Sequence, residues 1–242
     1  MENLAMKTAI VTGGGTGMGR SIAKALLREG AEVIICGRRM EPLQKVVTDE
    51  ATSYQGKILA IQTDVSKEED VSNLLSVALD KFGGKIDILI NNAGISGKGN
   101  IHEHDIEIWD EVMAINLRGP FLLARAILPI MRSHKSGHII NISSEAGLEY
   151  YEGYGAYGVA KHALNALGEF IQRENQELGI RVNTICPGMV VTEMTDDLTN
   201  LNREKSLYSE DITDLVLWLL TRRTNVKIGR PLLIQTMENP WL

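Results

Sequence analysis

Seven short β-rich runs that alternate with helical stretches constrain the fold of this chain most strongly. Helical stretches such as GRSIAKALLREG and VSNLLSVALDKFG carry apolar residues at three- and four-residue spacing. Apolar strands separated by helices are typical of a parallel sheet covered on both faces. The pattern therefore predicts a doubly wound α/β fold with a seven-stranded, mainly parallel sheet, whose strands fall in residues 7–13, 31–37, 57–64, 86–94, 137–144, 180–188 and 230–236.

Composition narrows the class of protein. The 242 residues are 44% hydrophobic and 23% charged, as in ordinary globular proteins, and no repeat or linker divides them. The net charge of −6 and the scattered basic residues argue against nucleic acid. Cys36 and Cys186 lie in apolar runs, which fits reduced thiols. The N-terminal apolar run is too short for a signal peptide, and no apolar run approaches about eighteen residues, so we expect a cytoplasmic protein without a membrane span.

The first strand-to-helix turn, residues 12–21, reads TGGGTGMGRS. Glycines in such a turn let the backbone approach a phosphate, and the free N–H groups of the following helix add hydrogen bonds and partial positive charge. Dinucleotide sites and P-loops both use this device, but Arg20 stands where a P-loop needs lysine. A tight turn without a ligand is the remaining alternative to a dinucleotide site.

The end of the second strand bears on which dinucleotide would bind. NAD sites usually place an acidic residue about 20 residues after the turn, to hold the ribose hydroxyl. This chain has Gly37, Arg38 and Arg39 there. Without a carboxylate there is no repulsion toward a 2′-phosphate, and a guanidinium can form charge-assisted hydrogen bonds to it. The sequence favours NADP over NAD, with a pair of solvated arginines as the alternative interpretation.

A cluster of four of the six tyrosines occurs in LEYYEGYGAYGVAKHAL, residues 148–164. Tyr157 and Lys161 are four residues apart and therefore share a face of a helix, a spacing that no other tyrosine has. Ser144 closes the strand run 137–144, at the strand end where open α/β sheets bind ligands. These three residues are candidate catalytic groups.

Seven motifs in a fixed order resemble the short-chain dehydrogenase/reductase family from Lys7 to about Thr236. They are TGGGTGMG (12–19), DV (64–65), NNAG (91–94), NLRG (116–119), INISS (140–144), YGVAK (157–161) and PGMVVT (187–192). The resemblance implies a single NAD(P)-binding Rossmann domain over residues 1–242, with 189–208 as a substrate lid. The ending NVKIGRPLLIQTMENPWL departs from the usual family ending, so subunit contacts inferred from that ending do not carry over.

The same resemblance implies roles for individual residues. The catalytic tetrad would be Asn116, Ser144, Tyr157 and Lys161. Substrate contacts are expected from Ser144 and Tyr157, and from Tyr151 and Tyr154 because they lie in the loop between those two residues. The residues expected to bind the cofactor, Arg38 included, are Gly13, Thr16, Gly17, Met18, Gly19, Arg38, Asp64, Val65, Asn91, Asn92, Ala93, Gly94, Tyr157, Lys161, Pro187, Gly188, Val190 and Thr192.

The expected chemistry is hydride transfer between a nicotinamide and a carbonyl or secondary alcohol. Tyr157 would be the general acid or base. We expect Lys161 and the positive nicotinamide of the oxidised cofactor together to lower its pKa from about 10 by about three units, which takes roughly 4 kcal/mol. Ser144 would hold the substrate oxygen. By resemblance, Lys161 would also bind the nicotinamide ribose, and Asn116 would hold a water that links the lysine to solvent.

Several alternatives remain open at this stage. The leading function is an NADP(H)-dependent oxidoreductase; the others are an NAD-preferring dehydrogenase of the same family and a low-turnover dinucleotide-binding sensor or scaffold. Intact Ser144, Tyr157 and Lys161 favour turnover. Tyr150, Tyr151 and Tyr154 fit either pocket walls or ordinary packing. Glu145 and Glu149 are either solvated or suited to a cationic or polyhydroxy substrate.

Metal binding and self-association are the last two questions. His102 and His104 in IHEHDIEIW suggest a metal site, but no further histidine or cysteine cluster completes one, so we expect none. His162 is expected to be structural. The helices predicted near 108–133 and 154–178 have apolar faces that resemble the family's dimer-forming helices. We therefore expect a homodimer or homotetramer that acts on a small molecule, with no nucleic-acid or membrane partner.

Overall fold

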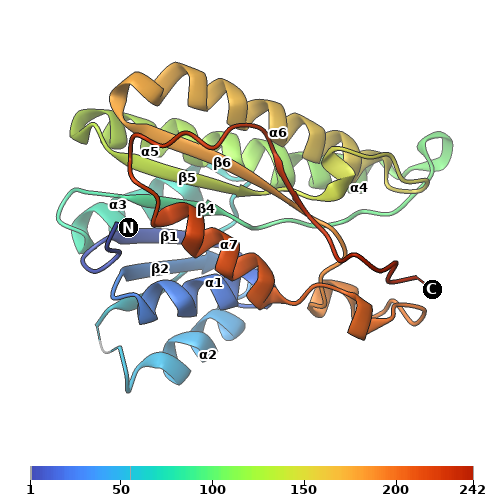
Figure 1. Cartoon of the computed structure of the whole chain (residues 1–242), viewed down its shortest axis with the longest axis horizontal. Coiled ribbons are helices and arrows are strands. Elements are labelled where there is room, and N and C mark those ends of the chain that lie inside the picture. The colour runs from blue at the N-terminus through green and yellow to red at the C-terminus, as the bar shows by residue number, and fades with distance from the viewer. Residues whose placement is uncertain (1, 55, 242) are drawn as a thin grey trace.

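All strands of this computed structural model, which describes residues 2–54 and 56–241, join in one parallel sheet (Figure 1). The strand order is β3-β2-β1-β4-β5-β6-β7, and every pairing is parallel. The strands are β1 (Thr8–Thr12), β2 (Glu32–Gly37), β3 (Ile58–Gln62), β4 (Ile88–Asn91), β5 (Gly137–Ile142), β6 (Ile180–Pro187) and β7 (Leu232–Ile234). The predicted seven-stranded α/β fold is confirmed.

Helices cover both faces of the sheet and make a three-layer molecule (Figure 1). One face packs against α1 (Gly17–Arg28), α2 (Met40–Glu50) and α7 (Ser209–Leu220). The other packs against α3 (Glu68–Lys81), α5 (Gly119–His134) and α6 (Gly155–Asn175). Shorter pieces are α4 (Ile106–Met113), the π-helix η2 (Ala114–Arg118), and the 3₁₀ turns η1 (Ile101–Glu103), η3 (Glu145–Gly147), η4 (Gln176–Leu178), η5 (Glu193–Thr195) and η6 (Arg203–Lys205).

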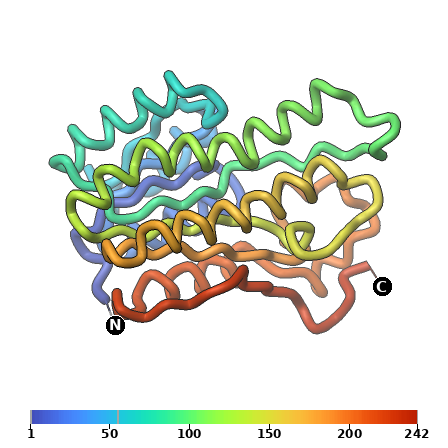
Figure 2. The backbone as a smooth tube through the Cα atoms, turned by 90° about the horizontal axis from the view of Figure 1, so that it is seen from above, coloured from blue at the N-terminus to red at the C-terminus, as the bar shows by residue number. Residues whose placement is uncertain are grey.

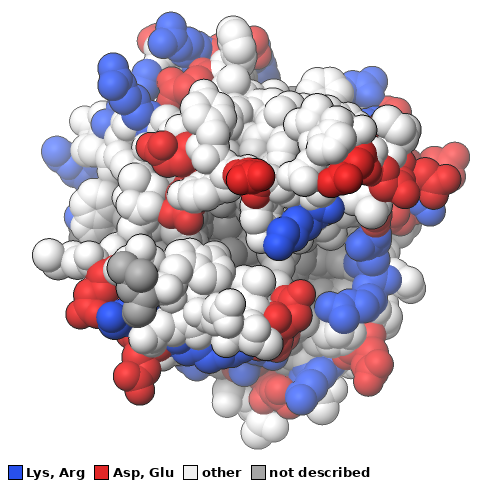
Figure 3. Space-filling view, turned by 90° about the vertical axis from the view of Figure 1, so that its right-hand side faces the viewer, with Lys and Arg blue, Asp and Glu red and all other residues white. Residues whose placement is uncertain are grey.

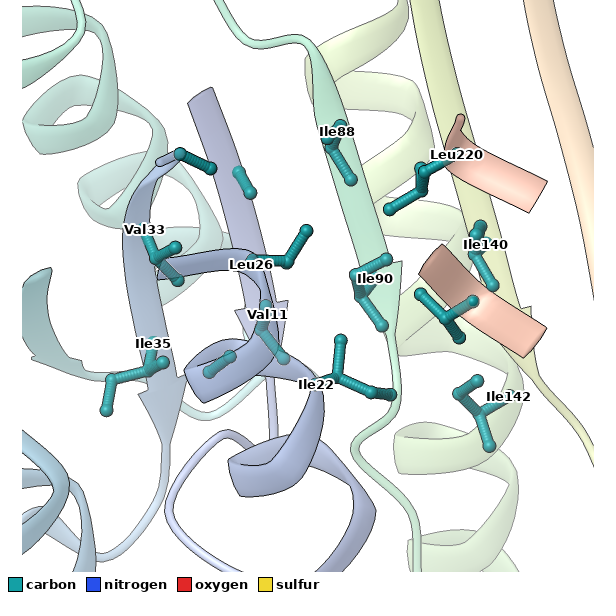
Figure 4. Close-up of a cluster of buried hydrophobic side chains, with 14 of the residues drawn as sticks. Val11, Ile22, Leu26, Val33, Ile35, Ile88, Ile90, Ile140, Ile142 and Leu220 are labelled. Carbon is teal, nitrogen blue, oxygen red and sulfur yellow. The ribbon is translucent and has the colours of Figure 1, made fainter. Parts of the chain in front are cut away.

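Each face of the sheet has its own apolar core. Side chains alternate along a strand, so Val33 and Ile35 of β2 face α1, whereas Ile34 and Cys36 face the opposite layer. Figure 4 shows the first core, where Ile22 of α1 lies among the strand side chains. Because both faces are covered, the strands need continuous apolar runs rather than alternating ones.

One helical stretch, Ile106–His134, is long and apolar enough to cross a membrane by length and composition alone, with a mean hydropathy of 1.3. Core helices of soluble proteins pass the same test. Its second half, α5, buries Leu122, Leu123, Ile127 and Met131 in the core on one face of the sheet. The apolar character of this half is therefore explained by packing within the domain.

The strand order changes direction at β1, which has β2 on one side and β4 on the other. Open α/β sheets bind ligands at such a point, beyond the carboxyl ends of the strands. At this end of the molecule, residues 189–208 form a loop closed by backbone hydrogen bonds of Leu207 with Met189 and Val191. The C-terminal segment runs to the same end (Figure 2), where the N–H of Asn202 donates to the carbonyl of Pro240.

Candidate active site

A cleft of about 580 Å³ lies at the carboxyl ends of β1, β2, β3 and β4. The edge of the molecule that carries these strand ends is hollowed near its centre, with Lys and Arg side chains beside the hollow and Asp and Glu side chains near its rim (Figure 3). Seven of the predicted cofactor residues line the cleft: Gly13, Thr16, Arg38, Asp64, Val65, Ala93 and Gly94. Lining residues that the sequence did not single out include Gly15, Pro42, Leu43, Thr63, Ile95, Ser96, Ile115, Glu193 and Met194.

The glycine turn is packed too tightly for side chains. Gly13 has a left-handed backbone with φ of 64°, and a Cβ there would lie 2.8 Å from Nδ2 of Asn92. Gly19 lies directly against the carbonyl of Gly13. The Asn92 amide donates to the carbonyls of Thr12 (2.9 Å) and Gly13 (3.3 Å), so this predicted cofactor residue braces the turn.

The start of α1 is suited to an anion. Its N-cap residue, Thr16, has an extended backbone and lines the cleft. Within the described chain no side chain caps this helix start, so its first N–H groups remain open to a ligand. A bare backbone turn followed by free N–H groups fits the pyrophosphate of a dinucleotide.

Arg38 lines the cleft where the sequence placed it, but it already has a partner. Its Nη1 donates to Oε1 of Glu111 in α4 at 2.6 Å, and both side chains are half-exposed. Asp64 lies on the same wall; burial opposes its charge, but hydrogen bonds from Ser66 and the nearby charges of Lys67 and Arg38 lower its pKa. The cleft therefore has both an acidic and a basic group at this end.

Three of the predicted catalytic residues come together where β5 ends and α6 begins. The Ser144 hydroxyl is hydrogen-bonded to the Tyr157 phenol. Nζ of Lys161 lies 5.5 Å from the centre of the Tyr157 ring and donates to the carbonyl of Ile142 at 2.9 Å. The four-residue spacing on α6 thus places phenol and ammonium on one face, as predicted.

Asn116, the fourth member of the predicted tetrad, lies in the π-helix η2, and π turns are frequent at functional sites. Its side chain accepts from the N–H of Ile95 at 2.9 Å and donates to the Ile95 carbonyl at 2.8 Å. A Cβ on Gly94 would lie 3.1 Å from Asn116 Oδ1 and 3.6 Å from Lys161 Nζ, so these residues are neighbours. Asn116 therefore also anchors the chain just after β4, which the sequence did not suggest.

The residues of the chain by themselves do not lower the Tyr157 pKa, so the expected depression, which also counted on the positive nicotinamide, stays a prediction. Burial raises the pKa of Tyr157, the hydrogen bond with Ser144 opposes that rise, and the charge of Glu145 adds to it. Lys161 is itself buried, and burial lowers its pKa to about 8, so Lys161 loses its proton more easily than an exposed lysine does. The phenol is consequently protonated at neutral pH, which is the form that donates a proton.

Several predicted cofactor residues lie outside the cleft lining. Val190 lies in the core on the α1 side of the sheet, and Met18 of α1 packs against that core. Thr192 lies beside the glycine turn, since a Cβ on Gly17 would be 3.2 Å from its Cγ2. The predicted residues that do not line the cleft are Gly17, Met18, Gly19, Asn91, Asn92, Tyr157, Lys161, Pro187, Gly188, Val190 and Thr192.

The other tyrosines of the cluster separate into different environments. Tyr150 is exposed and stacks on His162, with ring centres 5.1 Å apart. Tyr151 is hydrogen-bonded to Glu145, which raises the Tyr151 pKa in addition to the larger effect of burial. Tyr154 lies under Nζ of Lys98, 5.9 Å from the ring centre. Of these three tyrosines, only Tyr151 is hydrogen-bonded to Glu145, the residue that follows Ser144.

The histidine-rich loop shows no metal-ligand geometry. His102 approaches Glu103, and His104 hydrogen-bonds the carbonyl of Asp105 and meets Trp109 edge-on. Among the described residues, no three His, Cys, Asp or Glu side chains are grouped as metal ligands would be. Cys36 and Cys186 are both buried free thiols.

Comparison with known proteins agrees with this geometry. The family model described as short chain dehydrogenase matches residues 7–202. The chain belongs to the short-chain dehydrogenase family. An uncharacterized oxidoreductase of Staphylococcus aureus (strain MRSA252) is 36% identical over 229 residues, which cover 95% of this chain and 97% of that protein. One from Staphylococcus epidermidis is 32% identical over the same shares of both chains.

Solved structures of similar fold include a reductase and a dehydrogenase. A levodione reductase superposes with a TM-score of 0.87 at 28% identity, covering 96% of both chains. An alcohol dehydrogenase of Thermococcus sibiricus complexed with 5-hydroxy-NADP superposes with a TM-score of 0.88 at 26% identity, covering 97% of this chain and 98% of that one. This short-chain dehydrogenase is thus an NAD(P)-dependent oxidoreductase, which favours an enzyme over a sensor or scaffold.

Proposed function

We propose that this short-chain dehydrogenase transfers hydride between NADP(H) and a carbonyl or secondary alcohol, with Tyr157 as the general acid or base. The observation that carries the proposal is the hydrogen-bonded pair of Ser144 and Tyr157, next to buried Lys161 at the carboxyl edge of the sheet. With its pKa raised, the Tyr157 phenol is protonated at neutral pH, which is the form that a general acid in carbonyl reduction requires.

When bound in the cleft, a reduced nicotinamide would supply the hydride for the carbonyl carbon. The Ser144 hydroxyl holds the carbonyl oxygen, which takes the π-electron pair as the new C–H bond forms. Tyr157 then transfers its proton to that oxygen and is left as a phenolate, which solvent reprotonates. Lys161 stabilises the phenolate while its own ammonium is charged, and Asn116 fixes the chain beside it.

The preference for NADP over NAD rests on Arg38, which lines the cleft at the end of β2. A 2′-phosphate placed there would compete with Glu111 for the guanidinium. The Thermococcus sibiricus dehydrogenase and a metagenomic short-chain oxidoreductase, which has 30% identity, a TM-score of 0.84 and coverage of 98% of this chain and 100% of that one, were both solved with NADP-type ligands. An NAD-preferring enzyme is the competing possibility.

The segment 189–208 is proposed to act as the substrate lid of one domain spanning residues 1–242. Glu193 and Met194 line the cleft, and Glu193 pairs with Arg20 of α1 at 3.2 Å. This ion pair joins the lid to the helix that begins at the glycine turn. Both side chains are more than two-fifths exposed, so the ion pair contributes little stability and leaves the lid able to open.

The test is a screen of NADPH oxidation against a panel of ketones and aldehydes, repeated with NADH. For the best substrate, Tyr157→Phe is expected to keep NADPH affinity and to lose about 10²- to 10⁴-fold in turnover, since only the acidic hydroxyl is removed. Tyr150→Phe is the matched control, because Tyr150 is exposed and stacks on His162. Turnover by Tyr157→Phe at the rate of the unmodified enzyme would refute the proposal.

A further inference from the structure

The Glu145 carboxylate lies next to the proposed catalytic residues Ser144 and Tyr157, but the proposed hydride and proton transfers do not use it. Glu145 follows Ser144 directly and opens the turn η3. A Cβ on Gly188 would lie 3.1 Å from its Oε2, and its charge acts on the Tyr157 phenol. The carboxylate therefore lies between the catalytic hydroxyls and the segment that follows β6.

Two donors hold this carboxylate, one from the far end of the chain and one from the same loop. Nε2 of Gln235, just after β7, donates to Oε2 of Glu145 at 2.5 Å across 90 residues of sequence. Tyr151 makes the second hydrogen bond. A carboxylate has about four acceptor positions, so two donors fix its orientation and leave capacity for further ones.

In the part of the chain that the structure describes, no cationic side chain forms an ion pair with Glu145. The residue is only partly accessible to solvent. The negative charge of Glu145 opposes ionisation of the catalytic phenol. A hydrogen-bond donor or a cation on the substrate could use the acceptor positions of Glu145 and offset this charge.

We propose that Glu145, oriented by Gln235 and Tyr151, forms a subsite that selects carbonyl substrates with a hydroxyl or ammonium group beside the reacting carbonyl. The proposal rests on the function proposed above. The substrate's donor group bonds to the free acceptor positions of Glu145 while its carbonyl oxygen reaches Ser144 and Tyr157. A hydrogen bond to a charged group that is made in the transition state raises kcat/KM roughly 10- to 100-fold.

The selectivity is measured with three ketones of matched size: butanone, hydroxyacetone and protonated aminoacetone. For each enzyme form, kcat/KM with NADPH for the two donor-bearing ketones is divided by that for butanone. Comparing these ratios between enzyme forms cancels the intrinsic reactivity of each ketone. The forms are the unmodified enzyme, Glu145→Gln, which keeps the shape, Glu145→Ala, which removes the acceptor, and Glu149→Gln as a charge-matched control on an exposed neighbour.

We expect Glu145→Ala to lower both ratios about 10-fold or more, and Glu145→Gln to lower the aminoacetone ratio more than the hydroxyacetone ratio. Glu149→Gln should leave both ratios as they are. A fall confined to one ketone identifies whether ammonium or hydroxyl is the preferred donor. If all three ketones are reduced but the ratios do not change in either Glu145 variant, the subsite is refuted and the function stands. If Tyr157→Phe turns over like the unmodified enzyme, the proposed function itself fails.

Discussion

Lys161 is a buried cation whose charge changes within an accessible pH range. Burial lowers its pKa to about 8 from 10.5, and the nearby Cys186 thiol opposes part of that fall. In the unfolded chain the same lysine stays protonated up to about pH 10.5. The unfolded state therefore binds more protons between these two pKa values, and the stability that depends on Lys161 rises with pH across that window.

Lys161→Met removes this titration but keeps a side chain of similar length. The unfolding free energy of Lys161→Met minus that of the unmodified protein should be about 3 kcal/mol more positive at pH 7 than near pH 10.5, which means that the variant gains stability at the lower pH. The loss of the hydrogen bond to Ile142 shifts both values equally. Urea unfolding at the two pH values measures the change, and a difference independent of pH would show that the lysine is not buried as a cation.

Arg38 is the residue on which the cofactor preference depends. Arg38→Asp should weaken NADPH binding about 10- to 100-fold, because a charge-assisted contact with the 2′-phosphate is replaced by repulsion, and should leave NADH binding equal or tighter. Glu111→Gln, which removes the competing ion pair, should tighten NADPH binding instead. Titration of both cofactors by fluorescence checks this; equal affinities of the unmodified protein for NADPH and NADH would contradict it.

The first helix depends on one close backbone contact. Gly19 in α1 faces the carbonyl of Gly13 and the amide of Asn92, so a methyl group there must push α1 away from the turn. Gly19→Ala should cost about 1–3 kcal/mol of stability and weaken NADPH binding. Gly229→Ala is the control, since its Cβ would meet nothing nearer than 4.0 Å. Unchanged NADPH affinity in Gly19→Ala would rule out this turn as the pyrophosphate site.

At the level of whole elements, apolar runs and helical spacing predicted every strand to within a few residues. The helix expected at 154–178 is α6, Gly155–Asn175, and the one expected at 108–133 spans Ile106–His134. The π turn inside the latter was not predicted, because it is stabilised by Asn116 bonding Ile95 rather than by local propensity.

In the candidate site, too, the features that depend on contacts between distant residues could not be predicted from the sequence. Family motifs predicted Ser144, Tyr157 and Lys161, because their spacing determines their geometry once strand and helix are in place. The contacts of Arg38 with Glu111 and of Glu145 with Gln235 join residues 73 and 90 positions apart. No local pattern carries such information, and the raised pKa of Tyr157 likewise depends on burial by the whole fold.

For the molecule as a whole, His138 makes the free energy of unfolding depend on pH in the acidic range. It lies buried on β5 with Nε2 bonded to Asn183 at 2.8 Å. Burial, reinforced by the charge of Arg181, lowers its pKa to about 3 from 6.5. The unfolded chain takes up this proton first as pH falls, so stability is lost progressively from about pH 6.5 toward pH 3.

His138→Gln keeps a donor for Asn183 and removes the titration. The fall in unfolding free energy between pH 7 and about pH 4.5 should be smaller in this variant by about 3 kcal/mol. Urea denaturation at both pH values compares the two proteins. An identical fall in both would mean that other groups account for acid sensitivity.

Self-association and location in the cytoplasm stay predictions. Phe121 on α5 and Phe170 on α6 are 47% and 64% exposed, which leaves apolar surface on the two helices expected to pair. Burial of such surface is typical of homo-oligomers.

The central claim, direct hydride transfer assisted by Tyr157, is tested most directly with NADPH deuterated at both C4 positions. The alcohol formed from the best ketone should carry one deuterium on its carbinol carbon by mass spectrometry, and Tyr157→Phe should form little of it. An unlabelled alcohol, or equal labelled product from Tyr157→Phe at the same rate, would contradict the account.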